Sequence, residues 1–341
     1  MHRKRIREFA RNFHENGMKL LLEDPKNVRD LLMLVSRDIA ERIDLEHVKP
    51  VKQTFVRKDY RHVHTDSVLT APLRGEPEGG KRVWIYILIE HQSEPDRMMP
   101  LRLHDYVIQI LRYQERQWKR RHRSVAGLQL QPVLPIVLYT GNKRWDTVGT
   151  LPDLIDPGAA EFRRYTPRME SFFLNVSRIG RALLAAAGGF FGPVLRLAAF
   201  KRAPLAKFRE LLVAVIRALE AMATAERLRW LELLSYIHAL VYHVRHPEEQ
   251  PGLWRQIEAS AATDPHRQEV ARVSRTIADA LRDETRLETV RETLTRQLCR
   301  RFGDVPEETI ALIESTKSLK RLKGWLDRFA TAETLDDVGI E

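Results

Sequence analysis

The chain has 341 residues, 43% of them hydrophobic and 30% charged, a composition that predicts a globular protein of about two domains. No run reaches the about 18 apolar residues of a membrane span, and no apolar segment follows the basic start, so we expect neither a membrane protein nor a secretory signal. A single cysteine, Cys299, excludes an internal disulfide and a cysteine-based zinc cluster and favours the cytoplasm. The net charge of +11 favours a polyanionic partner, chiefly nucleic acid.

The N-terminal part of the sequence predicts two helices. Residues 1–22 have a helical pattern with a basic face. Asp24 and Pro25 are typical of a helix start, since an acid caps the first turn and proline suits the first helical position. Apolar residues follow at helical spacing from Val28 to Ile43, so we expect one helix that packs a face on the core.

A change of period then predicts a small sheet. Residues 51–57, 64–71 and 83–90 are typical of short strands, and the last is an apolar run that indicates a strand buried on both faces. Proline and glycine crowd the loop between the last two strands, and such short links favour an antiparallel meander.

A helix predicted over residues 95–120 leads into another buried strand at 133–139. Pro100 lies in the first turns of this helix and is expected to delay its start or kink it. Pro135 indicates that the following strand lies at an edge of the sheet or contains a bulge. A helix between two strands is the usual parallel crossover, so we expect an α/β core of the order αβββαβ with a mixed sheet.

The remaining sequence is irregular at first and then helical. One further strand is expected at residues 172–176. Beyond residue 178 the apolar spacing predicts helices, whose apolar faces form a core or a surface for self-association or a partner. The expected helices are 204–222, 225–245, 265–300, 306–314 and 319–329. The expected parts are an α/β domain (1–178), a helical region (179–297) and a small helical C-terminal domain (298–341).

Two acidic residues and an amide lie at or near the ends of the predicted strands. Glu90 ends the apolar run, Asp66 lies in the preceding strand, and Gln92 shares the side of Glu90 if the strand continues. Converging carboxylates repel each other unless a cation lies between them, and their oxygens suit Mg²⁺ or Mn²⁺. Such an ion can activate water, while Gln92 can position water or a phosphate oxygen. Alternatively, Asp66 caps a turn and Glu90 pairs with Arg97 or Arg102.

Histidine and basic side chains lie near these strands in the sequence. His64, His91 and His104 match no standard spacing of zinc ligands. The helix over residues 95–120 ends in basic residues, which form either a solvated helix end or a track for phosphates, with Trp118 placed to stack on a base. These basic residues are Arg112, Arg116, Lys119, Arg120, Arg121 and Arg123.

A family resemblance is strongest over residues 89–106, whose sequence is Ile-Glu-His-Gln-Ser-Glu-Pro-Asp-Arg-Met-Met-Pro-Leu-Arg-Leu-His-Asp-Tyr. This stretch resembles the most characteristic part of the recombination-promoting nucleases, also called YhgA-like transposases, of the PD-(D/E)xK nuclease superfamily. Residues 14–19, 55–61 and 135–141 are similar to the family's start, to the approach to its first acid and to its last core strand. The resemblance covers residues 12–178 and implies a restriction-endonuclease-like fold.

The same resemblance implies a chemistry. It implies a Mg²⁺-dependent DNA endonuclease in which Asp66, Glu90 and Gln92 are the catalytic motif positions and both acids bind the metal. Glu15 stands where the family usually has aspartate, and because either residue can bind metal, Glu15 is a third expected ligand.

Gln92 also stands where the wider superfamily usually has lysine. Glutamine is normal for this family, and it leaves open which cation, Lys19 or Arg102, balances the scissile phosphate. Residues 294–329 resemble a small helical domain found after such nuclease domains.

The preferred hypothesis is therefore a metal-dependent endonuclease that cuts the phosphodiester bonds of DNA and promotes recombination or transposition-like events. Two alternatives remain open. The first is a DNA-binding protein whose nuclease core is degenerate and inactive. The second is a helical interaction protein that recruits a partner or forms a homo-oligomer through its C-terminal helices.

Overall fold

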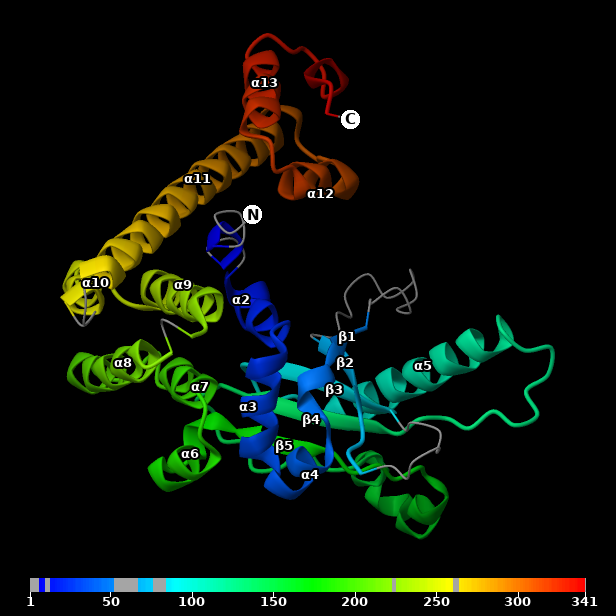
Figure 1. The fold of residues 1–341 in the computed structure, drawn as a ribbon. Helices are drawn as coiled ribbons and strands as arrows, with labels where there is room; N and C mark the ends of the chain where they lie inside the picture. The colour runs from blue at the N-terminus through cyan, green and yellow to red at the C-terminus, as the bar shows by residue number, and fades with distance from the viewer. Residues whose placement is uncertain are drawn as a thin grey trace.

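The computed structural model describes residues 6–9, 13–51, 67–75, 84–222, 225–259 and 264–340, with the side chains of 14–16, 181, 185, 264 and 265 left out. A sheet lies at the centre, and helices cover both of its faces (Figure 1). None of the helices in these described ranges is long and apolar enough to cross a membrane.

The sheet has five strands in the order β1-β2-β3-β4-β5. Strands β1, β2 and β3 pair antiparallel, whereas β3, β4 and β5 pair parallel, so the predicted mixed sheet is confirmed. Helix α5 connects β3 to β4, which is the parallel crossover that the sequence predicted. The strands are β1 Lys49–Pro50, β2 Ser67–Pro72, β3 Trp84–Gln92, β4 Val133–Tyr139 and β5 Phe172–Asn175.

Two details of the strands differ from the sequence prediction. Strand β1 ends at Pro50, just before the strand predicted over residues 51–57. Residues 52–66, which include most of that predicted strand and the start of the one predicted over 64–71, lie outside the described residues. Strand β4 is not an edge strand, because it lies between β3 and β5. Pro135 is nevertheless tolerated there, since β5 pairs with β4 only from Ile136 onward and leaves the strand paired on one side at the proline.

The single helix predicted from Pro25 to Ile43 is two helices, α3 Pro25–Val35 and α4 Arg37–Arg42. Asp24 caps α3 as predicted, because its side chain accepts a hydrogen bond from the backbone N–H of Lys26 at 2.8 Å. The break occurs at Ser36, whose extended backbone ends α3 and whose hydroxyl caps α4. The apolar spacing hid this break because it continues through the serine.

The predicted helices after residue 95 are confirmed with small shifts of their ends. Of the helix predicted over residues 1–22, residues 6–9 and 13–22 are helical, and the rest lie outside the described residues. Helix α5 begins only at Met99, so Pro100 does delay its start. The α-helices are α2 Phe13–Leu22, α5 Met99–Lys119, α6 Arg181–Ala187, α7 Phe191–Ala199, α8 Leu205–Glu220, α9 Arg227–Val244, α10 Gln250–Ala259, α11 Asp264–Phe302, α12 Glu307–Ser315 and α13 Leu319–Phe329. The 3₁₀ turns are η1 Leu45–His47, η2 Leu151–Leu154, η3 Pro157–Tyr165, η4 Val176–Arg178 and η5 Asp336–Val338.

The two faces of the sheet pack on different cores. Ile87 and Ile89 of β3 point into a large core shared with helices α2 to α4 and α6 to α11. Leu88 points the other way, into a smaller core that α5 closes with Leu103 and Tyr106. Helices α2 to α4 and α6 to α11 therefore pack on one face of the sheet, and α5 covers the other.

A third core lies at the far end of α11. This helix has 39 residues and leads away from the sheet to α12 and α13 (Figure 1). Leu294 and Leu298 near its end pack with Leu322 and Trp325 of α13 in a core separate from the other two. Helix α11 runs unbroken through residues 297 and 298, and the division of the chain into three parts stays a prediction.

A buried charged network ties the helices together. Asp30 of α3 accepts hydrogen bonds through Oδ2 from Arg229 of α9 at 2.5 Å and from the backbone N–H groups of Phe190 and Phe191 at 2.8 and 3.0 Å. Arg229 also donates to the side chain of Asn27 at 2.8 Å. The Asp30 carboxylate thus holds α9 and the start of α7 against α3.

Gly189 is required beside this network. Its φ is +75°, and a Cβ atom there would lie 2.3 Å from the Asp30 carboxylate. Any side chain at this position would therefore displace the acid that joins the helices.

We predict that Asp30→Ala lowers the free energy of unfolding by about 1–3 kcal/mol, because the N–H groups of Phe190 and Phe191 lose their acceptor, while Arg229 keeps its ion pair with Glu226 at 3.0 Å. Urea denaturation of the full chain measures this change. Glu41→Ala is the control, since it removes an exposed ion pair with Arg37 and should change stability little. A loss for Asp30→Ala no larger than that of the control would contradict the assignment.

Candidate functional site

Glu90 is a buried carboxylate at the end of the central strand β3. Only 1% of the residue is exposed. The strand is paired on both sides here, since Ile89 pairs with Ser67 of β2 and Glu90 itself pairs with Val137 of β4. Because side chains alternate along a strand, Glu90 points to the same face as Leu88, which is the face that α5 covers.

Arg102 of α5 neutralises this carboxylate. Its Nη2 atom lies 2.6 Å from Oε1 of Glu90, and its Nη1 atom lies 2.8 Å from Oδ2 of Asp96. The same guanidinium donates to the hydroxyl of Tyr106 at 3.3 Å. The sequence left open whether Glu90 pairs with Arg97 or Arg102, and the structure selects Arg102.

The charge of Arg102 is strongly held. Burial by itself would lower the pKa of the guanidinium, but the hydrogen bonds to Tyr106 and Asp96 and the charge of Glu90 outweigh burial and raise that pKa. The Arg102 side chain is still 35% exposed. It therefore presents a permanent positive charge at the end of β3 that solvent and ligands can reach.

Gln92 lies beside Glu90 on the same side of the strand. Its Nε2 atom donates to Oε1 of Glu90 at 3.2 Å. Its backbone oxygen accepts from the N–H of Thr140, which follows β4, at 2.9 Å. This bond brings the two strand ends so close that a Cβ atom on Gly141 would lie 2.1 Å from the backbone oxygen of Ser93. Only glycine fits at this position, and the Glu90–Gln92 pair is held by rigid backbone.

His91 points to the opposite face of the sheet. Its Nε2 atom lies 2.8 Å from Oγ1 of Thr140, and burial together with the charge of Lys201 lowers the pKa of His91 to about 4. The imidazole is therefore neutral at pH 7. His104 bonds through Nδ1 to the backbone oxygen of Pro100 at 2.8 Å, and His64 lies outside the described residues.

The other predicted ligands are only partly covered by the structure. Asp66 lies outside the described residues, although Ser67, the next residue in the chain, pairs with Ile89. Glu15 is in α2, but its side chain is not among those described. Lys19 lies in the last turn of α2 and is half-buried.

Among the side chains that the structure does describe, no group of three or more histidine, cysteine, aspartate or glutamate residues is arranged to hold a metal ion. The described oxygen donors at the end of β3 are the carboxylate of Glu90 and the amide of Gln92. Both are ligand types that suit a hard cation, so the described part fits one half of the predicted metal site.

The basic residues at the end of α5 are not at the Glu90 site. An α-helix rises about 1.5 Å per residue, which places Arg116 and Lys119 about 20–25 Å along the axis from Arg102. Lys119 pairs with Glu115, and Trp118 stacks on His122 with ring centroids 3.8 Å apart. The remaining members, Arg120, Arg121 and Arg123, are exposed and follow directly on the helix.

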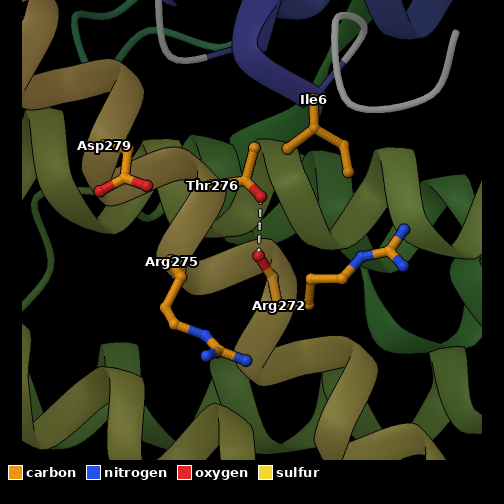
Figure 2. A pocket seen from close by; sticks show the side chains of 5 residues that line it. All are labelled: Ile6, Arg272, Arg275, Thr276 and Asp279. Atoms are coloured by element: carbon orange, nitrogen blue, oxygen red, sulfur yellow. Dashed lines mark hydrogen bonds between the residues drawn. The ribbon is translucent and has the colours of Figure 1, made fainter.

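A pocket elsewhere in the molecule does not belong to this site. It has a volume of about 590 Å³ and lies between the N-terminal helical turn at Ile6 and helix α11 (Figure 2). Arg272, Arg275 and Asp279 line it, and the hydroxyl of Thr276 bonds back to the backbone oxygen of Arg272 at 2.9 Å. Nothing in these contacts connects the pocket to the end of β3.

Sequence reasoning missed Asp96 and Tyr106 as members of the site. Both fix Arg102, through an ion pair at 2.8 Å and a hydrogen bond at 3.3 Å. The spacing of Arg102 and Tyr106, four residues apart on a predicted helix, could have indicated their contact. Asp96 precedes the helix, and its distance in sequence from Arg102 gave no such signal.

Comparison with known proteins places the chain among nuclease relatives. Residues 12–185 match the family model described as "Putative transposase, YhgA-like". The recombination-promoting nuclease RpnD of Escherichia coli O157:H7 is 30% identical over 131 residues, which are 38% of this chain and 46% of that protein. RpnC of Escherichia coli K12 is 26% identical over 129 residues, 38% of this chain and 39% of that protein.

A third relative carries a different name. The "Putative inactive recombination-promoting nuclease-like protein YjiP" of Escherichia coli K12 is 31% identical over 99 residues, which are 29% of this chain and 91% of that protein. The stretches of this chain that match RpnD and RpnC span less than half the length of each of those two proteins. No solved structure matches the chain significantly.

We predict that Arg102→Gln lowers the free energy of unfolding by about 1–3 kcal/mol, because the buried Glu90 carboxylate loses its ion pair while the partly exposed arginine moderates the loss. Denaturation of the full chain with urea measures this change. Arg97→Gln, which changes an exposed arginine in the turn just before α5, is the matched control and should leave stability unchanged.

A double-variant cycle with Glu90→Gln completes this test. Removal of both charges should recover part of the loss, because no buried charge then remains unpaired. Equal stability of Arg102→Gln and Arg97→Gln would show that the ion pair does not hold this strand end.

Proposed function

The chain belongs to the YhgA-like family, whose relatives include recombination-promoting nucleases, and from this premise we propose that it is a metal-dependent endonuclease that cuts DNA and promotes recombination. The catalytic centre in this proposal is the end of strand β3. Asp66 and Glu90 bind Mg²⁺ or Mn²⁺, with Glu15 as a third ligand, and Gln92 completes the site.

The observation that carries the proposal is the buried carboxylate of Glu90 beside the amide of Gln92. Burying a carboxylate in a packed sheet costs free energy unless a cation compensates its charge, so Glu90 needs a positively charged partner at this position. The antiparallel ladder supports Asp66 as the second ligand. Asp66 precedes Ser67 in the sequence, Glu90 follows Ile89, and Ser67 pairs with Ile89.

The bound ion would lower the pKa of a water molecule and stabilise charge on the scissile phosphate. The residues of the chain orient this chemistry. Glu90 cannot swing away, because β2 and β4 pair with β3 on both sides up to the site. Gln92 has both a donor and an acceptor and can therefore hold the attacking water or a phosphate oxygen.

Arg102 supplies the positive charge for the scissile phosphate that a lysine supplies in the wider superfamily, where Gln92 stands in this chain. It is charged at any relevant pH, a third of its side chain is exposed, and its fork suits a phosphate. On this proposal Arg102 holds Glu90 in the absence of DNA and turns part of its donors to the scissile phosphate when DNA binds. Lys19 is the other candidate for this role.

The basic end of α5 would hold the DNA backbone at a distance from the cut. Arg116, Lys119, Arg120, Arg121 and Arg123 begin about 20 Å along the helix from Arg102, which corresponds to about six base pairs of duplex. They contribute affinity rather than chemistry.

A degenerate core that binds DNA without cutting it is the second candidate. The Glu90–Arg102 ion pair favours it, because a carboxylate satisfied by a guanidinium at 2.6 Å needs no metal to be stable. The name of the relative YjiP describes such a loss of activity in that protein. Cleavage assays separate the two candidates.

We predict that the purified chain nicks or linearises supercoiled plasmid with Mg²⁺ or Mn²⁺, and not with EDTA or with Ca²⁺. Glu90→Gln and Asp66→Ala should each reduce the cleavage rate by about two orders of magnitude or more, because the ion loses a ligand that positions it. Agarose gels of a time course measure the rates.

Glu94→Gln is the matched control, since it removes an exposed glutamate four residues after Glu90 that pairs with Lys143. It should cut like the wild type. Circular dichroism and DNA binding in EDTA show that each variant is folded. A wild-type protein that binds DNA but cuts it with neither metal would establish the degenerate core instead, and unchanged cleavage by Glu90→Gln would refute this site.

A further inference from the structure

A second pocket lies between the 3₁₀ turns η2 and η3, on the connection from β4 to β5. Its volume is about 440 Å³, and its lining includes Arg163, Arg164, Arg168 and Thr150. Turn η2 packs against α5, so the pocket is on the face of the sheet to which Glu90 points. We call the segment from Thr150 to Arg168 the 150–168 platform.

Two aromatic rings stand out from this platform. Phe162 is 58% and Tyr165 69% exposed, in a chain that buries most of its large apolar side chains. A 3₁₀ turn has about 3.0 residues per turn and rises about 2.0 Å per residue, so residues three apart lie on one side of it, about 6 Å apart. Both rings belong to η3 and therefore point from the same side.

The ring of Tyr165 is held by its neighbour Arg164. The Arg164 guanidinium lies over its ring at 4.8 Å from the centroid and donates to the phenol oxygen at 2.8 Å. This contact covers one face of the ring and fixes its orientation. A planar group can stack on the ring from the other side at little entropic cost.

Three arginines and one acid, Asp153, line this pocket, so positive charge is in excess there. Within the described ranges none of the three arginines forms an ion pair closer than 4.0 Å, and the enclosed Nε of Arg163 has no hydrogen-bond partner. The Asp153 carboxylate accepts from the backbone N–H and the hydroxyl of Thr150 at 2.7 and 2.8 Å, and these bonds, together with the charges of Arg163 and Arg168, lower its pKa. A buried donor without a partner is costly, and it indicates that an anionic ligand completes the pocket.

We propose that the 150–168 platform binds a single-stranded stretch of nucleic acid, with bases stacked on Phe162 and Tyr165 and phosphates bound by Arg163, Arg164 and Arg168. The inference rests on the proposed function, in which nucleic acid is the substrate. It adds a second contact, separate from the Glu90 site and from the basic end of α5.

The chemistry of the platform favours this partner over others. Exposed rings can stack on unpaired bases, whereas the bases of a duplex are covered by their neighbours. The unpaired arginines and the net charge of +11 favour a polyanion over a protein of mixed charge. The platform therefore recognises DNA that is already opened, such as the end or gap that recombination produces.

Fluorescence anisotropy of the full chain tests the proposal, in EDTA so that cleavage plays no part. The probes are a labelled single-stranded oligothymidylate and a duplex of the same length. The double variant Phe162→Ala/Tyr165→Ala should bind the single strand roughly ten- to a hundred-fold more weakly, since each stacked base contributes to affinity, and should bind the duplex as the wild type does. Tyr165→Phe keeps the ring and should bind the single strand nearly as well as the wild type.

The salt dependence of binding tests the arginines independently. Arg163→Gln/Arg168→Gln should reduce the slope of log affinity against log salt by about 1.4 for single strands, at about 0.7 for each phosphate contact. The aromatic variants should leave the slope unchanged. The matched control, Arg272→Gln/Arg275→Gln, removes two arginines from the pocket in Figure 2 and should leave both affinity and slope unchanged.

Single-strand binding by Phe162→Ala/Tyr165→Ala at wild-type affinity would overturn the platform, whether or not the protein cuts DNA. An equal loss for single strand and duplex would overturn it too, because stacking on unpaired bases would then not explain the rings. Failure of the plasmid assay alone would leave these binding results unaffected, so the two proposals can fail separately.

Discussion

The burial of one carboxylate sets the conditions for the rest of this structure. Glu90 ends a central strand that is paired on both sides, and 1% of it is exposed. Since a buried charge needs a compensating charge, an element with a fixed cation must lie over the strand end. Helix α5 meets this need with Arg102, and the crossover from β3 to β4 determines that α5 covers this face. The chemistry of the site and the topology of the sheet are therefore linked through one ion pair.

The helical half of the chain supports the same strand from the other side. Ile87 and Ile89 of β3 pack in one core with helices that lie beyond the stretch matched by the family model. Asp30 joins α3 to α9 and α7 through a buried network, which fixes these helices as one body against the sheet. The position of Glu90 consequently depends on residues far outside its own motif. The C-terminal core at the end of α11 is separate from this arrangement.

Periodicity predicted the order of elements well because strands and helices here have clear apolar faces. It failed at Ser36, where one residue breaks the helix without changing the apolar pattern. It also failed at Pro135, where the proline is accommodated because β5 does not pair with β4 at that residue. For the site, the sequence supplied Glu90 and Gln92 but could not choose between Arg97 and Arg102, because that depends on the rotation of α5. The separation of the basic end of α5 from Glu90 was already contained in the sequence, since it follows from the rise of the predicted helix. The roles of Asp66 and Glu15 stay predictions.

The central claim is that Glu90 belongs to a metal site rather than only to an ion pair with Arg102. Binding of Mn²⁺ to the full chain, followed by the electron paramagnetic resonance signal of the free ion, tests it without any substrate. The account predicts that the wild type removes free Mn²⁺ from solution and that Glu90→Gln binds it at least about ten-fold more weakly. Equal Mn²⁺ binding by the two proteins, or none by the wild type, would contradict it.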